Sequence, residues 1–128
     1  MTLQTPLKKT ACSLKVYSAS ESNHHFLEKI NQIIHQNIEN ETFNSEMLSR
    51  STKHSRAKLF QKIKEMTGLS TTLYIRWVRL ERSRKLLCQN TDSIREIAFQ
   101  VGFSDLAYYS RCFKQTYGIT PSSFRNNC

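Results

Sequence analysis

The sequence predicts an all-α protein in which two helix-turn-helix units are joined by a long connecting helix, with about seven helices in all. Three observations support this fold class. Gly and Pro are scarce, at 3 and 2 of 128 residues, which favours helix over turn-rich structure. Apolar residues recur at helical spacing through most of the chain, and the patterns of residues 44–64 and 93–114 repeat each other.

The N-terminal part is expected to hold a polar segment and one helix. Residues 1–22 mix Ser, Thr and Lys with isolated apolar residues, which predicts a tail or linker, although LKVY at 14–17 could form a strand. Apolar residues then recur at i, i+3, i+4 and i+7 from Phe26 to Ile38, which predicts a helix with a wide buried stripe. Ser22 or Asn23 would cap this helix, and the polar run NIENET would end it near Asn40.

Residues 44–64 predict the first helix-turn-helix unit. Asn44 or Ser45 begins one helix, and Ser55 caps the next. At about 100° per residue, the second helix turns one set of side chains inward and another outward. The inward set is Leu59, Ile63 and Met66, and the outward set is Ala57, Gln61 and Lys64.

Positive charge is concentrated in this unit. The whole sequence has 19 Lys and Arg against 10 Asp and Glu, for a formal net charge of +9. The basic residues between positions 50 and 64, with no acidic residue among them, are Arg50, Lys53, Arg56, Lys58, Lys62 and Lys64. An ordinary basic surface helix is the alternative, but a solvated face usually mixes signs. The patch therefore predicts contact with the phosphates of a polyanion.

Residues 70–89 predict the connecting helix, capped by Ser70 and apolar almost all round. At about 1.5 Å per residue it spans roughly 28 Å, close to the roughly 34 Å that separates successive major-groove faces. It would therefore hold two recognition helices about one groove apart. Arg76 and Arg79 are expected to face phosphate, and Trp77 to anchor packing rather than to stack on bases.

Residues 93–114 predict the second unit. Ser93 and Glu96 form a capping box, Gly102 lies where the chain turns, and Ser104 is expected to cap the second helix. That helix has an apolar side and a small, polar and basic side. The apolar side is Tyr109, Cys112, Phe113 and Thr116, and the outward side is Ala107, Ser110, Arg111 and Lys114.

The two units match position by position. Leu48 corresponds to Ile97 at an offset of 49, and after one extra residue Leu59 corresponds to Tyr109 at an offset of 50. The outward faces match as well, since Ala57 corresponds to Ala107 and Gln61 to Arg111. This weak repeat is the strongest internal evidence for a pair of helix-turn-helix units.

The end of the chain should close the second unit. Gly118 suits a helix C-terminal cap, and Thr120-Pro121 starts a short terminal turn that carries Phe124 back onto the unit. The cysteines and histidines lack metal-ligand or nucleophile–base spacing, so we expect reduced thiols, no metal, no cofactor and no enzymatic activity. They are Cys12, Cys88, Cys112, Cys128, His24, His25, His35 and His54.

From about Phe26 to Arg125 the chain resembles the DNA-binding domain of the AraC/XylS family of bacterial transcription regulators. The most specific part is IREIAFQVGFSDLAYYSRCFKQTYGITPSSFR, which reads almost as the signature I-x-x-I-A-x-x-x-G-F-x-x-x-x-Y-F-x-x-x-F-K-x-x-x-G-x-T-P-x-x-[YF]-R, with Tyr109 in place of Phe. LSTTLYIRWVRLERSRKLL and KEMTGLS resemble the family's connecting helix and the turn before it. The resemblance implies two homeodomain-like units whose recognition helices enter adjacent major grooves on one face of double-stranded DNA.

The resemblance also implies a set of DNA contacts. The base-reading side chains would be Ala57, Phe60 and Gln61 on the first recognition helix and Leu106, Ala107, Tyr108, Ser110 and Arg111 on the second. Arg111 can pair bidentately with guanine and Gln61 with adenine, whereas the small apolar side chains can only contact thymine methyls. With the basic patch, the expected phosphate contacts are Arg56, Lys58, Lys62, Lys64, Arg76, Arg79 and Lys114.

The first unit departs from the family pattern at its turn. Thr52, Lys53 and His54 replace the usual apolar residue, Gly and apolar residue. A non-Gly residue in a left-handed turn costs on the order of 1 kcal/mol, so this unit is expected to dock less firmly than the second. His54 is expected to be a solvated turn residue.

These observations predict a sequence-specific transcription regulator, an activator, organised as a tail or linker (1–22), a first subdomain (23–69), the connecting helix (70–89) and a second subdomain (90–128). Its partners would be double-stranded DNA, RNA polymerase and an upstream sensor or receiver domain. A basic helical RNA-binding or protein-interaction module is the alternative, which would explain the charge but not the repeat. No apolar run reaches the roughly 18 residues of a spanning helix and no signal peptide is evident, so the protein is expected in the cytoplasm.

Overall fold

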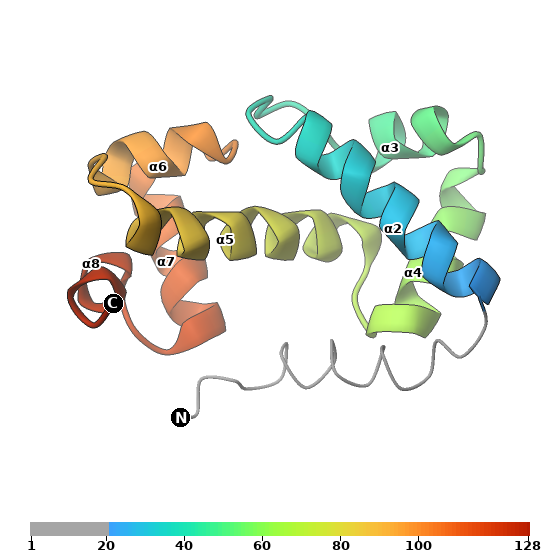
Figure 1. Ribbon diagram of the computed structural model, residues 1–128. Coiled ribbons are helices and arrows are strands. Elements are labelled where there is room, and N and C mark those ends of the chain that lie inside the picture. Colours follow the sequence, from blue (N-terminus) through green and yellow to red (C-terminus); the bar gives the residue numbers. More distant parts are fainter. Residues whose placement is uncertain (1–20) are drawn as a thin grey trace.

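A computed structural model describes residues 21–128 as an all-α arrangement. Figure 1 shows two helical units at opposite ends of the long helix α5 (Thr71–Gln89). The first unit contains α2 (Glu21–Gln36), α3 (Ser45–Thr52) and α4 (Arg56–Thr67). The second contains α6 (Ile94–Gln100), α7 (Leu106–Tyr117) and α8 (Pro121–Asn126). The described residues thus form seven helices and no strand, which confirms the predicted fold class.

Each unit has its own hydrophobic core, and α5 contributes to both. The first-unit core is Ile30, Ile34, Phe43, Leu48, Leu59, Ile63, Tyr74, Ile75 and Val78. The second-unit core is Leu80, Leu87, Ile97, Ala98, Val101, Phe103, Tyr109, Cys112, Phe113 and Tyr117. The N-terminal half of α5 therefore completes one core and its C-terminal half the other, which explains why this helix is apolar almost all round. No helix among residues 21–128 is long and apolar enough to cross a membrane.

Several helix boundaries follow the predicted capping residues. Asn44, Ser55 and Ser70 accept hydrogen bonds at the starts of α3, α4 and α5. Ser93 and Glu96 form the reciprocal capping box at α6. At the C-terminal end of α7, Gly118 adopts φ +86°. Phe124 packs against Phe113 with the ring centroids 5.7 Å apart. Each of these local predictions is confirmed.

Two boundary predictions were wrong, and a third falls almost wholly outside the described residues. The helix expected after Ser22 or Asn23 begins at Glu21 and ends at Gln36 rather than near Asn40. Ser104 does not cap α7, because Asp105 lies one residue closer and its carboxylate accepts from two amides of the first turn. The expected tail falls almost wholly in residues 1–20, which lie outside the described residues.

The cysteines also differ from the expectation of reduced thiols. Cys88, in the last turn of α5, forms a disulfide with Cys128, the last residue of the chain, and their Cα atoms are 5.5 Å apart. That separation lies in the middle of the range for disulfides. The bond closes a loop that contains the whole of α6, α7 and α8. Cys112 remains a free thiol and is buried in the second-unit core, as its position on the apolar side of α7 predicted.

Candidate nucleic-acid interface

In the first unit, α4, the helix that follows the turn after α3, presents the predicted base-reading side chains to solvent. Ser55 accepts a hydrogen bond from the Lys58 amide at 3.1 Å, which fixes where α4 begins and hence which side chains face outward. Leu59 and Ile63 are buried on the inner side. Ala57, Phe60 and Gln61 are all exposed, Phe60 by 45%.

In the second unit, α7 likewise presents predicted base-reading side chains to solvent. The Asp105 carboxylate accepts from the Ala107 amide at 2.9 Å and fixes the start of the helix. Ala107, Tyr108 and Arg111 are exposed, and Ser110 is half-buried. Leu106 is also half-buried and packs against the second-unit core, so less of its side chain is available for contact with a base.

Tyr108 connects α7 to the connecting helix. Its hydroxyl accepts a hydrogen bond from Arg76 Nη1 on α5 at 3.3 Å. The guanidinium carbon of Arg111 lies 5.7 Å from the centroid of the Tyr108 ring, within the range of a cation–π contact. Tyr108 thus contacts both basic side chains, Arg76 through its hydroxyl and Arg111 through its ring, and the ring contact holds Arg111 beside the exposed start of α7.

Exposed side chains at the start of α4 and Tyr108 of α7 line two adjoining grooves. A groove of about 440 Å³ is lined by Arg56, Ala57 and Phe60 of α4 together with Ser45 and Thr72. A second groove, of about 270 Å³, is also lined by Ser45 and Thr72 and extends to Arg76 and Tyr108. Because the two grooves share residues, they adjoin, and we call the surface they form the concave face. It runs from α4 past the start of α5 to α7.

Several basic side chains of α4 and α7 are available to an external anion. Arg56, Lys58, Lys64, Arg111 and Lys114 are exposed. None of them belongs to the ion pairs found in residues 21–128, whose basic members are His24, Arg50 and Arg84. Arg50, the first residue of the basic patch, is instead paired with Glu46 at 2.7 Å. The first turn of α4 holds no acidic residue, which leaves the positive end of its helix dipole uncompensated.

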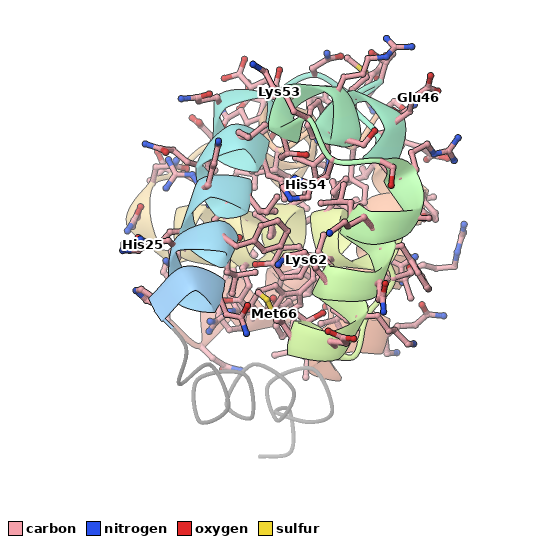
Figure 2. The ribbon with its side chains drawn as sticks, turned by 90° about the vertical axis from the view of Figure 1, so that its right-hand side faces the viewer. His25, Glu46, Lys53, His54, Lys62 and Met66 are labelled. Carbon is pink, nitrogen blue, oxygen red and sulfur yellow. A yellow bond between two sulfur atoms is a disulfide. The ribbon has the colours of Figure 1, made fainter. Side chains whose placement is uncertain are left out.

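Lys62 does not share the outward face of α4. Its ammonium lies 4.7 Å from the centroid of the Phe26 ring on α2. Figure 2 shows Lys62 and His54 between α2 and α4. At about 100° per residue, Lys62 lies roughly 140° round the helix from Ala57, which explains its direction. We therefore leave Lys62 out of the phosphate contacts proposed below.

Arg79 is also placed differently from the sequence prediction. It is 6% exposed, and its guanidinium donates hydrogen bonds to three backbone carbonyls, of which the bond to Val101 is buried and those to Ile38 and Asn40 are partly buried. Burial lowers the pKa of this guanidinium from its ordinary value. Because its side chain is covered and both of its Nη atoms donate to backbone carbonyls, Arg79 has no face to offer a phosphate, and it too is left out.

The turn of the first unit has the conformation that the sequence comparison suggested. Lys53 adopts φ +62° and is the non-Gly residue with a positive φ among residues 21–128, whereas the second unit has Gly102 at φ +93° in the equivalent place. His54 is half-buried rather than solvated, because its ring packs edge-on against Phe26 at 5.4 Å and its Nδ1 lies 3.1 Å from the Thr52 carbonyl oxygen. The contacts of His54 and Lys62 with Phe26 tie this turn and α4 to α2.

Sequence reasoning missed two features of the interface. The sequence does not single out Asp105 as the cap, because Ser104 precedes it and is an equally good capping residue. The Arg76–Tyr108 hydrogen bond joins residues 32 positions apart, for which a single sequence carries no signal. In the described part of the chain, no cluster of three or more His, Cys, Asp or Glu side chains is suited to a metal ion.

Two helix-turn-helix units with exposed second helices on one concave, basic face define the class of double-stranded DNA-binding domains. A family model described as a helix-turn-helix domain matches residues 48–127. A crystal structure of a transcriptional regulator from Chromobacterium violaceum, described as AraC-type DNA-binding domain-containing, superposes with a TM-score of 0.76 at 27% identity, over 84% of this chain and 96% of that one. The chain belongs to the AraC/XylS family of helix-turn-helix DNA-binding domains.

Two curated relatives are much longer than this chain. Histidine kinase P4 of Formosa agariphila is 36% identical over 107 residues, which are 84% of this chain and 8% of that protein. The HTH-type transcriptional activator RhaR of Pectobacterium carotovorum is 35% identical over 83 residues, which are 65% of this chain and 29% of that protein. The chain therefore spans less than a third of either relative.

Proposed function

We propose that this chain is the DNA-binding part of a transcription regulator and that α4 and α7 enter adjacent major grooves on one face of the duplex. The observation that supports the proposal is the concave face, which is lined by Arg56, Ala57 and Phe60 of α4 and by Tyr108 of α7 around the start of α5. The unpaired basic side chains beside it supply the attraction to phosphate.

The individual contacts follow from the chemistry of the exposed side chains. Arg111 is the best candidate for a bidentate contact with guanine, and Gln61 for one with adenine. Ala57 and Ala107 permit close approach and contact with thymine methyl groups, and Phe60 offers a larger apolar surface for the same purpose. Tyr108, Ser110 and the exposed part of Leu106 would complete the second reading helix. The proposed phosphate contacts are Arg56, Lys58, Lys64, Arg76 and Lys114.

We propose that the two units contribute differently to affinity and to base discrimination. The first carries the denser positive charge but a turn with a non-Gly residue at positive φ. The second has the better-formed turn, a complete capping box and an arginine restrained by Tyr108. The second unit would therefore supply much of the base discrimination, chiefly through Arg111, and the first unit much of the affinity.

The wider role is proposed from the relatives. The similarity to a protein named as a transcriptional activator supports activation, with RNA polymerase as the protein partner. The similarity to a much longer protein named as a histidine kinase supports an upstream sensor or receiver domain in the same polypeptide or pathway. Both roles, and access to chromosomal DNA, imply a cytoplasmic protein.

Selection of binding sites from a random duplex pool tests the proposal. We expect one sequence with two half-sites about one helical turn apart, bound at least about 10³-fold more tightly than random duplex at physiological salt. Affinity should fall steeply with salt, because each neutralised phosphate releases counterions. Equal binding of selected and random duplexes would contradict sequence-specific recognition, and preference for structured RNA in a competition assay would favour the RNA-binding alternative.

The proposed base contacts can be tested on the selected site with matched variants. Arg111→Ala should cost roughly 1–3 kcal/mol and relax preference at one base pair, whereas Lys114→Ala should weaken binding to all sequences alike. Gln61→Ala should cost less specificity than Arg111→Ala. A uniform loss for Arg111→Ala on every sequence would identify Arg111 as a phosphate contact, and a larger specificity loss for Gln61→Ala would reverse the proposed ranking of the units.

A further inference from the structure

The buried guanidinium of Arg79 lies where the two units meet. Arg79 Nη1 donates to the carbonyl oxygen of Ile38 at 2.6 Å and to that of Val101 at 2.7 Å, and Nη2 donates to the carbonyl oxygen of Asn40 at 3.0 Å. Ile38 and Asn40 belong to the loop that follows α2 in the first unit. Val101 belongs to the turn between α6 and α7 in the second unit. One side chain on α5 therefore binds backbone from both units at once.

The backbone around this guanidinium leaves no spare room. Gly102 follows Val101 in the same turn, and a Cβ placed on it would lie 1.3 Å from Arg79 Nη1 and 2.4 Å from the Ile38 carbonyl oxygen. Gly102 thus serves two purposes, since it takes up φ +93° and it lets the first-unit loop and Arg79 approach the second-unit turn. The fit between the three segments requires Gly at 102 and a planar, multiple donor at 79.

The same junction has an apolar component. Ile38 lies in the loop that follows α2 of the first unit, yet its side chain packs against the second-unit core. Direct contact between the units is otherwise limited, because the substantial helix–helix contacts in residues 21–128 either lie within one unit or involve α5. Ile38 and Arg79 therefore form the main bridge between the units apart from the continuous backbone of α5.

Loss of the guanidinium would leave the carbonyl groups of Ile38 and Val101 without their donor, whereas the Asn40 carbonyl would still accept from the Phe43 amide at 3.0 Å. An unpaired carbonyl that is covered from water is costly, so the loop after α2 and the α6–α7 turn would be expected to separate until water reaches the Ile38 and Val101 oxygens. Each unit would keep its own core, since neither core contains Arg79. The expected consequence is a change in how the two units are oriented, with each unit still folded.

We propose that Arg79 is a positioning residue that locks the two helix-turn-helix units in one relative orientation and so sets the spacing of half-sites that the protein accepts. Arg79 touches no DNA in this scheme. Its effect on recognition is exerted through the fixed distance and rotation between α4 and α7. This inference rests on the proposed function for its consequence on DNA, whereas the lock itself is a property of the free protein.

A spacing series tests the consequence on DNA. The selected site is made with its natural spacing and with one or two base pairs inserted or removed between the half-sites, and a duplex with a single half-site is included. One base pair moves a half-site by about 3.4 Å and rotates it by roughly 35°. We expect the wild-type protein to lose about tenfold or more in affinity at a wrong spacing, and Arg79→Met to bind all spacings within about threefold of one another. Binding to the single half-site should be unchanged.

Two controls separate the lock from charge and from general stability. Arg82→Met removes a positive charge from an exposed position on the same helix and should keep the wild-type spacing preference. Arg79→Lys keeps the charge but lacks the planar set of donors, and it should give a broadened preference between wild type and Arg79→Met. If Arg79→Met fails to fold, Arg79→Lys carries the test alone.

The free protein provides a readout that does not depend on DNA. Residual dipolar couplings measured separately for α2–α4 and α6–α8 should fit one alignment tensor in the wild type and two different tensors in Arg79→Met. One shared tensor in Arg79→Met, or an equal loss of affinity at every spacing and on the single half-site, would overturn the proposal. Failure of the wild type to prefer the selected site over random duplex would instead contradict the proposed function, and the couplings alone would then decide whether the lock exists.

Discussion

Reduction of the Cys88–Cys128 disulfide is expected to weaken the folding of the second unit. The bond joins residues 40 positions apart and closes a loop containing α6, α7 and α8. Opening the loop restores conformational freedom to the unfolded chain without removing any packing contact from the second-unit core. The folded structure should therefore persist after reduction but with a smaller free energy of unfolding.

The size of this effect can be worked out from the loop length. In the chain-entropy description, a crosslink that closes a loop of about 40 residues lowers the entropy of the unfolded state by roughly 13 cal/mol/K, which corresponds to about 4 kcal/mol at 25 °C. A domain of this size typically has about 5–15 kcal/mol of stability in total. Reduction is thus expected to remove a large share of it.

Urea titrations with and without a reducing agent measure the effect, and a thiol assay under denaturing conditions establishes which form is present. Reduction should lower the unfolding midpoint of the wild-type protein. Cys128→Ser should have the lower midpoint under both conditions, and Cys12→Ser serves as a matched control because the bond joins Cys88 to Cys128. Equal midpoints for oxidised and reduced wild-type protein would refute the reasoning that the crosslink stabilises this unit.

Three further expectations concern the turn of the first unit, the cap of α7 and one buried tyrosine. Lys53→Gly should raise the free energy of unfolding by about 1 kcal/mol, because Gly adopts φ +62° without strain; an unchanged urea midpoint would count against strain at this turn. Asp105→Ala should cost about 1 kcal/mol through loss of the α7 cap, with Asp105→Asn closer to wild type, and equal losses for both would argue against capping. Burial raises the pKa of Tyr109 to about 12, so its contribution to stability is complete below pH 10 and is lost as the pH rises towards 12. Stability should fall by about 2 kcal/mol more in wild type than in Tyr109→Phe between pH 9 and pH 12, and parallel curves would contradict this.

The parts of the fold that could be predicted are those encoded by local spacing. Capping residues such as Ser55 and Ser93, the glycines that end or join helices, and the alternation of buried and exposed positions each act within one or two turns of helix. The repeat added information because two independent copies of the same pattern support each other. Asp105 shows the limit of such reasoning. Ser104 and Asp105 have similar capping ability, so the sequence alone does not determine which of them caps α7.

The parts that could not be predicted depend on contacts between distant segments. In the sequence Arg79 is one of several arginines on the connecting helix, and its burial follows from carbonyl groups 22 to 41 positions away. Lys62 is part of the basic patch and is therefore predicted to contact phosphate, but its ammonium lies against the Phe26 ring on α2. The pairing of Cys88 with Cys128 likewise follows from α8 returning to the end of α5, which cysteine spacing alone does not reveal. Because of these tertiary contacts, two of the predicted phosphate contacts, Lys62 and Arg79, are not among the proposed ones.

Dimethyl sulfate footprinting on the selected duplex tests the central claim most directly, because the reagent modifies N7 of guanine in the major groove, where α4 and α7 are proposed to bind. The account predicts two protected groups of guanines about one helical turn apart on the same face of the duplex, with Arg111→Ala losing protection only in the group read by α7. Protection of a single major groove, or loss of both groups in Arg111→Ala despite saturating protein, would contradict recognition by two units.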